Sequence, residues 1–257
     1  MADVFASVKD VDCGSYELLS KPARAALDKL PVVGVDALDF GQGDCNAIVA
    51  KEGTDRRPVV LCDVGGGKGP TGGATHPWHD DWKITTAAPD VLLEPAIIQS
   101  HWDSDHYSTA VFAWRKLTLG DEERHVPTTK KLEALYDHCR WLVRRQRNGP
   151  SNTDFVRAVK SMVCWPEGLE GHSFQISPNT YVRVEPCTGE NSAKSDRNLC
   201  GLAVRLVRTS KPDHTEDAKV TADIAEQAIL PGDAPYKLFA SAEAKWADAK
   251  VTILFAH

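Results

Sequence analysis

Four residues that can bind a metal ion lie within six positions, directly after an apolar segment. In the stretch AIIQSHWDSDHYSTA, residues 96–110, the apolar run ends and is followed by His101, Asp103, Asp105 and His106. Imidazoles combined with carboxylates suit zinc, manganese or iron. A solvated polar turn is the alternative interpretation, but polar groups at the end of a buried strand are costly unless they are used. We therefore predict a metal site here.

The spacing of the four residues leaves two arrangements open. In an extended segment, residues two apart face the same side, so that His101, Asp103 and Asp105 would converge while His106 pointed elsewhere. A turn at this point would instead divide the four ligands between two adjacent ions. One cluster rarely completes a metal site, so further ligands must come from distant loops.

Strands and helices alternate in blocks around this cluster. Patterns typical of strands cover residues 32–40, 46–53, 57–67, 91–100, 173–177, 181–186, 202–208, 228–233 and 251–257. Helical spacing or capping predicts helices over 21–30, 108–117, 128–150, 153–163 and 236–250. Residues 65–75 and 209–219 are expected to be flexible. This order favours an α+β fold of packed layers with no clean domain boundary.

Composition sets limits on the class of protein. The 257 residues carry a net charge of −6 and are 42% hydrophobic, which is ordinary for a globular chain. No apolar run approaches the roughly 18–20 residues that span a bilayer, so we expect no membrane segment. The seven cysteines are odd in number and form no C-x-x-C pair, which favours reduced thiols. We expect a cytoplasmic protein.

A basic stretch offers a candidate surface for phosphates. In CRWLVRRQR, the predicted helix over 128–150 would place Arg140, Arg144 and Arg145 on or near one face. A solvated helix face is the ordinary interpretation of such a pattern. The alternative is a surface that contacts the phosphates of a substrate or nucleic acid, with Trp141 available for stacking.

The motif H-x-D-x-D-H after an apolar strand resembles the metallo-β-lactamase superfamily, whose usual form is H-x-H-x-D-H. The aspartate at the third position is similar to the soluble domain of the competence protein ComEC and its relatives. Further segments resemble the motifs of that family in the same order: DFGQGDCNAIV (39–49), VVLCDVGGG (59–67), ILPGDAPY (229–236) and the terminal ILFAH (253–257). The resemblance implies a metallo-β-lactamase-like αβ/βα four-layer sandwich over residues 32–257. Residues 1–31 would form a lead-in, and a helical insertion would lie near 107–163.

The resemblance also implies a role for each matching residue. The expected metal ligands are His101 and Asp103 at a first ion, Asp105 and His106 at a second, Asp233 bridging both, and His257 completing the second site. Asp63 corresponds to the acidic residue that orients the ligands from below. The expected cofactor is a pair of zinc or manganese ions.

This chain departs from the family pattern in two places. The separate histidine that the family has before the bridging aspartate is not evident, because neither His172 nor His214 has a convincing context. Asn198, in SDRNLCGLAVRL, is the closest counterpart. The family continues past its last histidine, whereas this chain stops at His257, and we expect a domain truncated at its C-terminus.

These features lead to a functional expectation with alternatives. Bound metal would lower the pKa of a water molecule toward neutrality and so present hydroxide as the nucleophile. Asp103 or Asp105 could accept the proton. We expect a phosphodiesterase or nuclease whose substrate is a phosphoester, with nucleic acid as a candidate. The alternatives are an ester, lactone or thioester hydrolase on the same site, or a non-catalytic binding module on the same fold.

Overall fold

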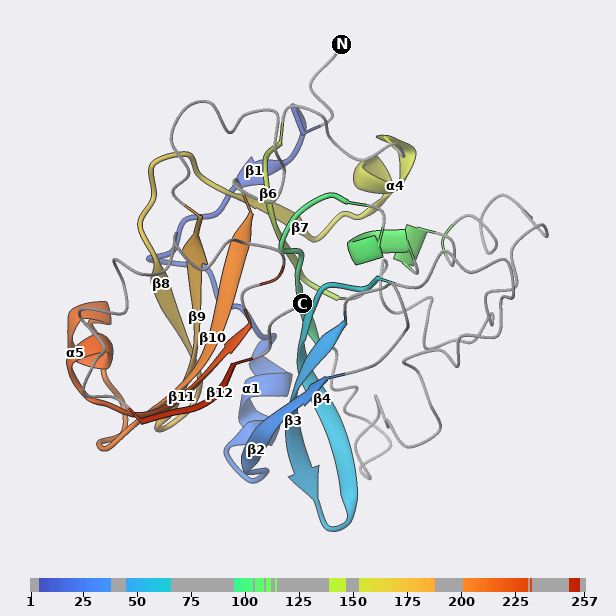
Figure 1. The fold of residues 1–257 in the computed structure, drawn as a ribbon. Helices are drawn as coiled ribbons and strands as arrows, with labels where there is room; N and C mark the ends of the chain where they lie inside the picture. The colour runs from blue at the N-terminus through green and yellow to red at the C-terminus, as the bar shows by residue number, and fades with distance from the viewer. Residues whose placement is uncertain are drawn as a thin grey trace.

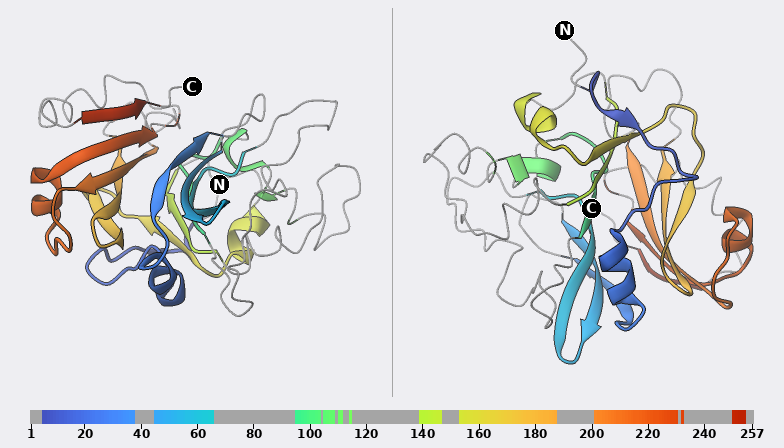
Figure 2. Two further views of the ribbon diagram at one scale, coloured as in Figure 1. Left: turned by 90° about the horizontal axis from the view of Figure 1, so that it is seen from below. Right: turned by 180° about the vertical axis from the view of Figure 1, so that it is seen from behind.

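A computed structural model of the protein describes residues 5–37, 45–65, 95–103, 105–108, 110–111, 114, 139–146, 153–187, 201–230, 232 and 250–254. Two mixed β-sheets form the centre of the molecule, and short helical segments pack against them (Figures 1 and 2). The prediction of an α+β fold is therefore confirmed.

The first sheet combines an antiparallel half with a parallel half. Its strand order is β1 (Lys9–Asp10), β7 (Met162–Trp165), β6 (Trp141–Arg144), β5 (Ala96–Ile98), β4 (Asp55–Cys62), β3 (Asn46–Glu52) and β2 (Val32–Ala37). Strands β2, β3 and β4 pair antiparallel. From β4 through β5, β6 and β7 to β1 every pair is parallel. The carboxyl ends of these parallel strands therefore lie at one edge of the sheet.

The second sheet is mainly antiparallel. Its order is β12 (Lys250–Leu254), β11 (Ile224–Leu230), β10 (Leu202–Thr209), β9 (Thr180–Pro186) and β8 (His172–Ser177). Strands β8 to β11 pair antiparallel with their neighbours, and β12 runs parallel to β11.

The main core lies between the two sheets. Val60 and Ile98 of the first sheet belong to one buried cluster with Val182 and Val204 of the second. Helix α1 (Lys21–Leu27) contributes Ala23 and Leu27 to the same cluster. Burial of apolar side chains from both sheets is the main favourable term that holds the sheets face to face, at roughly 25 cal/mol per Å² of apolar surface.

Helical segments cover the outer face of each sheet. On the first sheet, Trp141 and Val143 lie in a second buried cluster. This cluster also includes Trp114 and, from helix α4 (Thr153–Ala158), Phe155. On the second sheet, helix α5 (Asp217–Ala222) packs Val220 in a small cluster with β9 and β10 side chains. Strand residues therefore alternate between the central core and an outer one, which is the period-two pattern of a sheet buried on both faces.

Two predicted helices are wrong where the structure describes strands β6 and β7. The helix expected over 128–150 does not include residues 141–144, which form β6, and the helix expected over 153–163 ends at Ala158 before β7 begins at Met162. Both strands are short apolar runs buried in the centre of a parallel sheet. Such runs cannot be told from buried helix by periodicity alone. Within the stretch 107–163, where the sequence predicts a helical insertion, residues 141–144 and 162–163 lie in two strands of the first sheet.

Other boundaries also shift. Part of the segment 209–219, expected to be flexible, begins helix α5 at Asp217. The lead-in over 1–31 supplies β1 to the first sheet, and its Phe5 lies in the outer cluster. The helix expected over 236–250 lies outside the described residues except for Lys250, which begins β12.

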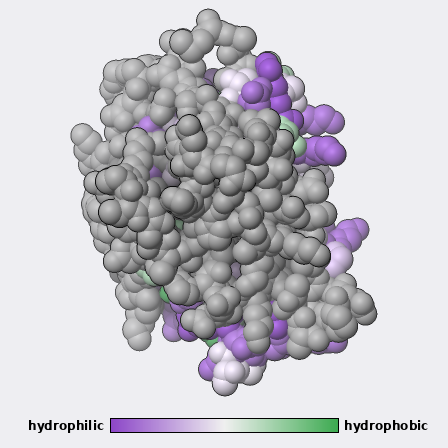
Figure 3. All heavy atoms as spheres, turned by 90° about the vertical axis from the view of Figure 1, so that its right-hand side faces the viewer, coloured by the Kyte–Doolittle hydropathy of each residue, from purple (hydrophilic) through white to green (hydrophobic). Residues whose placement is uncertain are grey.

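The described surface is polar. On the face seen in Figure 3, the described residues that reach the surface are mostly hydrophilic. Within the described ranges, Val33 is the one exposed large hydrophobic side chain, at 38%. Those same ranges contain no helix with the length and apolar character needed to cross a membrane.

Candidate functional site

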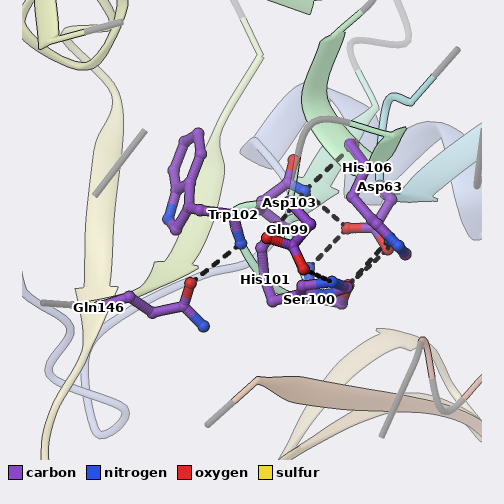
Figure 4. Close-up of polar contacts among 8 residues, drawn as sticks. All are labelled: Asp63, Gln99, Ser100, His101, Trp102, Asp103, His106 and Gln146. Carbon is purple, nitrogen blue, oxygen red and sulfur yellow. Dashed lines mark hydrogen bonds and ion pairs between the residues drawn. The ribbon is translucent and has the colours of Figure 1, made fainter. Parts of the chain in front are cut away.

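The candidate site forms where two neighbouring parallel strands end. Asp63 directly follows β4, and Gln99, Ser100 and His101 follow β5. Cys62 and Ile98 are register partners, so the residues that follow them leave the sheet side by side. Figure 4 shows these side chains gathered in one cluster. Open sheets of this kind bind ligands at the carboxyl ends of their strands.

Asp63 is the centre of this cluster. Its backbone has a left-handed φ of 66°, which aspartate tolerates better than most residues. Its Oδ1 accepts hydrogen bonds from Gln99 Nε2 at 2.9 Å and from the Ser100 backbone N–H at 2.6 Å. Its Oδ2 lies 2.6 Å from Ser100 Oγ and 2.9 Å from His106 Nδ1. Four contacts use the full acceptor capacity of a carboxylate.

His106 returns to the strand end because the chain turns. Its backbone N–H donates to the Asp103 carbonyl at 3.0 Å, and residues 105–108 are helical. The rings of His101 and His106 consequently lie 3.9 Å apart between centroids. The extended arrangement, in which His106 pointed away from the others, is therefore wrong, because a turn and a helix begin within the motif.

His101 is held between a hydroxyl and a carboxylate. Its Nδ1 lies 2.9 Å from Ser100 Oγ, and its Nε2 lies 3.5 Å from Asp103 Oδ2. The two imidazoles are almost fully buried, with 2% of His101 and 0% of His106 exposed, whereas the Asp103 side chain is 37% exposed. The cluster thus presents one partly exposed carboxylate beside two buried imidazoles.

The second sheet approaches this cluster through two glycines. A Cβ built on Gly201 would lie 2.9 Å from the Ser100 carbonyl oxygen, and one on Gly232 would lie 3.1 Å from Ser100 Oγ. Gly232 also has a left-handed φ of 57°. The N–H of Leu202 donates to the Ser100 carbonyl at 2.8 Å. Only a residue without a side chain allows this approach of Gly201 to the strand end.

Aromatic packing supports the cluster from the other side. The backbone N–H of Trp102 donates to Gln146 Oε1 at 3.0 Å. The Trp102 ring lies 5.7 Å from Phe5 and 5.5 Å from Tyr107 between centroids. Because Trp102 stands between His101 and Asp103 in the chain, this packing fixes the backbone that carries both of them.

Sequence reasoning missed Gln99, Ser100 and Gln146 as parts of the site. The signal for the first two was present, since the polar pair Gln-Ser ends the otherwise apolar AIIQS. Both are buried, at 0% and 5% exposure, and both contact Asp63. Gln146 lies within the helix predicted over 128–150, so the sequence does not show that it follows the end of a strand.

The three arginines of the basic stretch do not share a helix face. Arg140 precedes β6, Arg144 ends it and Arg145 follows it. Their guanidinium groups donate to backbone carbonyls: Arg140 to Glu17 and Leu19, Arg144 to Cys187 and Gly201, and Arg145 to Phe5 and Val8. The expected basic helix face is therefore wrong, because the segment is a strand whose arginines tie distant loops to the first sheet.

Several predicted site residues are not covered by this geometry. Asp233, His257 and Asn198 lie outside the described residues. Asp105 begins the helical segment and is partly buried. Within the described part of the chain, no group of three or more His, Cys, Asp or Glu side chains is arranged to hold a metal ion.

No family model matches the chain, and comparisons with curated proteins and with solved structures give no match. The interpretation of the site therefore depends on its own geometry.

Proposed function

We propose that the protein is a metal-dependent hydrolase with a metallo-β-lactamase-like αβ/βα four-layer sandwich, acting on phosphodiesters. The observation that carries this proposal is the contact of 2.9 Å between His106 Nδ1 and Asp63 Oδ2, in which both side chains are buried. Histidines that bind metals almost always donate their second ring N–H to a carboxylate, a backbone carbonyl or a water molecule, and a buried carboxylate fixes the ring most firmly. Two sheets pack face to face, and each carries helical segments on its outer face, which supports the fold part of the proposal.

One pair of donor atoms has a separation that suits a metal ion. Two ligand atoms, each about 2.0–2.2 Å from a tetrahedral ion, lie roughly 3.3–3.6 Å from each other. His101 Nε2 and Asp103 Oδ2 are 3.5 Å apart, which agrees with that separation. Imidazole nitrogens and carboxylate oxygens suit zinc or manganese. We assign His101 and Asp103 to one ion, and His106 and Asp105 to a second.

The same proposal takes its further ligands from residues that lie outside the described ranges. Asp233 directly follows Gly232, which lies against Ser100. This neighbour supports Asp233 as the bridging ligand. His257 as a ligand and Asn198 as a supporting residue depend on the sequence resemblance alone.

Divalent metal in this position would supply Lewis acidity toward a phosphoryl oxygen and would lower the pKa of a bound water. The residues of the chain have separate tasks. Asp63 orients His106, and the packing of Trp102 fixes the loop that carries His101 and Asp103. Asp103 and Asp105 are both partly exposed, and a carboxylate oxygen of either residue that does not hold an ion would accept the proton.

The substrate class is argued from the motif and from the arginines. The carboxylate-rich motif suits hard ions that handle phosphates. Residues 141–144 form a strand, so the basic helix face that favoured a polymeric substrate is absent there. Arg140, Arg144 and Arg145 instead donate to backbone carbonyls of the chain itself. This use of the arginines favours a second candidate, a hydrolase of small esters, lactones or thioesters on the same site.

Hydrolysis assays with a matched histidine control test the proposal. The protein is stripped with chelator and resupplied with zinc or manganese, then assayed with bis(p-nitrophenyl) phosphate and with p-nitrophenyl acetate. We expect metal to restore phosphodiester hydrolysis and His106→Ala to lower it by about 100-fold or more. His172→Ala is the control, because His172 is a partly buried histidine of β8 in the second sheet.

The remaining outcomes separate the alternatives. Metal-restored hydrolysis of the acetate alone would assign the second candidate. Metal binding without hydrolysis of either compound would contradict an enzyme and would favour the non-catalytic binding module.

A further inference from the structure

We infer that Ser100 is a positioning residue that transmits the effect of Asp63 to His101, so that one carboxylate fixes the proton position of both imidazoles. The observation behind this inference is the geometry of Ser100 Oγ. It lies 2.6 Å from Asp63 Oδ2 and 2.9 Å from His101 Nδ1.

A serine hydroxyl has one proton to donate, and the contact distances show which neighbour receives it. An ionised carboxylate only accepts hydrogen bonds. A distance of 2.6 Å lies in the range of about 2.5–2.7 Å that is typical of a hydroxyl donating to a carboxylate. Ser100 therefore donates to Asp63, and only its lone pairs remain for His101.

The tautomer of His101 follows from this assignment. Because Ser100 Oγ has no second proton, the contact at 2.9 Å is a hydrogen bond only if His101 Nδ1 donates. His101 then carries its proton on Nδ1 and its lone pair on Nε2. The same tautomer follows directly for His106, whose Nδ1 lies 2.9 Å from Asp63 Oδ2 and 3.5 Å from Ser100 Oγ.

Asp63 is itself held in position by donors that cannot reverse. The Ser100 backbone N–H and the Gln99 amide N–H both donate to Oδ1. The two hydrogens of the Gln99 amide are shared among Asp63 Oδ1 and the His101 and His106 carbonyls, which lie 2.8 and 3.1 Å from Nε2. These contacts keep Oδ2 directed at the hydroxyl and at His106, so the network has one consistent set of donors and acceptors.

This network has a consequence for the ligand atoms. With a lone pair on Nε2, His101 faces the acceptor atom Asp103 Oδ2 at 3.5 Å, and a cation between the two atoms would bind both. The consequence for metal binding rests on the function proposed above, whereas the two tautomers do not. Failure of the tautomer assignment and failure of the hydrolase proposal are therefore separable.

The test is ¹⁵N NMR of the imidazole nitrogens in the full chain, labelled at histidine, stripped of metal and held at alkaline pH. In the wild type we expect both His101 and His106 to be in the Nδ1–H form. His214 is an internal control with the opposite tautomer, because its Nε2 lies 2.7 Å from Asp223 Oδ2. A wild-type His101 in the Nε2–H form would overturn the inference without any variant.

Two variants then distinguish a relay from general support of the fold. Ser100→Ala should convert His101 into a mixture of tautomers while His106 and His214 keep theirs. Asp63→Asn should change both His101 and His106 and leave His214 unchanged. An unchanged His101 in either variant would overturn the inference. A structural role alone would not produce this difference between the two variants.

Discussion

The backbone N–H of Leu202, at the start of β10, donates a hydrogen bond of 2.8 Å to the carbonyl oxygen of Ser100, in the loop that follows β5. This bond joins the second sheet to the loop that carries His101. The loop is also tied to β4 through Asp63. The geometry of the candidate site therefore depends on how the two sheets meet.

Gly201→Ala tests this junction. The added Cβ would lie 2.9 Å from the Ser100 carbonyl oxygen, closer than side chains approach backbone, so the strand end or the glycine must shift. We expect a loss of about 1–3 kcal/mol in the free energy of unfolding, measured by urea denaturation, together with weaker zinc binding.

Gly34→Ala is the matched control, because a Cβ at Gly34 meets nothing within 4 Å. It should change stability by well under about 1 kcal/mol. Equal stability of the two variants would contradict the close contact at Ser100.

Replacement of Asp63 should separate charge from backbone shape. Asp63→Ala removes an acceptor from four buried donors, and each donor left without a partner costs about 1–3 kcal/mol. Asp63→Asn keeps one acceptor oxygen and tolerates the left-handed φ of 66°. We expect the thermal midpoint to fall further for alanine than for asparagine. Equal midpoints would contradict the account of Asp63 as the main acceptor of the cluster.

Arg145 should anchor the N-terminal segment. It donates to the carbonyls of Phe5 and Val8 and pairs with Asp10. Because hydrogen bonds from a charged donor are worth about 1.5–3 kcal/mol, Arg145→Met should speed amide exchange at Val8 and Val11 by roughly tenfold or more. Arg56→Met is the control, since Arg56 pairs with Asp36 on the exposed edge of the first sheet. Exchange that is unchanged in Arg145→Met would show that packing alone holds this segment.

The lowered pKa of Asp217 predicts that the free energy of unfolding falls at acid pH. Burial alone would raise its pKa, but hydrogen bonds from Ser173 and Arg183 outweigh burial and hold the pKa below its ordinary value. The folded-state pKa is then below the unfolded one. Its contribution is complete above the unfolded value of about 3.9 and is lost as pH falls through the folded value.

Urea unfolding across this pH range checks the sign. The stability difference between wild type and Asp217→Asn should be largest near neutral pH and should shrink below about pH 4. A difference that grows on acidification would contradict the assignment.

The sequence predicts most of the sheet architecture because alternating and β-branched runs are strong local signals. The strands over 46–53, 181–186 and 202–208 match β3, β9 and β10 to within one residue at each end. Strands β6 and β7 could not be predicted, because both are short apolar runs next to helical spacing. The side chains that bury these strands come from other parts of the chain. Phe155 of α4, for example, packs against Trp141 of β6.

The candidate site shows the same division. The types and spacing of His101, Asp103, Asp105 and His106 indicate a cluster without any structure. The return of His106 onto His101 depends on a turn whose geometry no periodicity encodes. The role of Ser100 depends on its neighbour His101 and on two partners far away in the chain, Asp63 and Leu202, so it could be found only from the fold.

Metal content per chain tests the central claim most directly. The protein is equilibrated with zinc or manganese, freed of excess ion by gel filtration and analysed for metal, in parallel with a His101→Ala, His106→Ala double variant and with His172→Ala. We predict about one to two ions per chain in the wild type and in His172→Ala, and loss of bound metal in the double variant. A wild type that retains no metal, or a double variant that retains as much as the wild type, would contradict a metal site at the ends of β4 and β5.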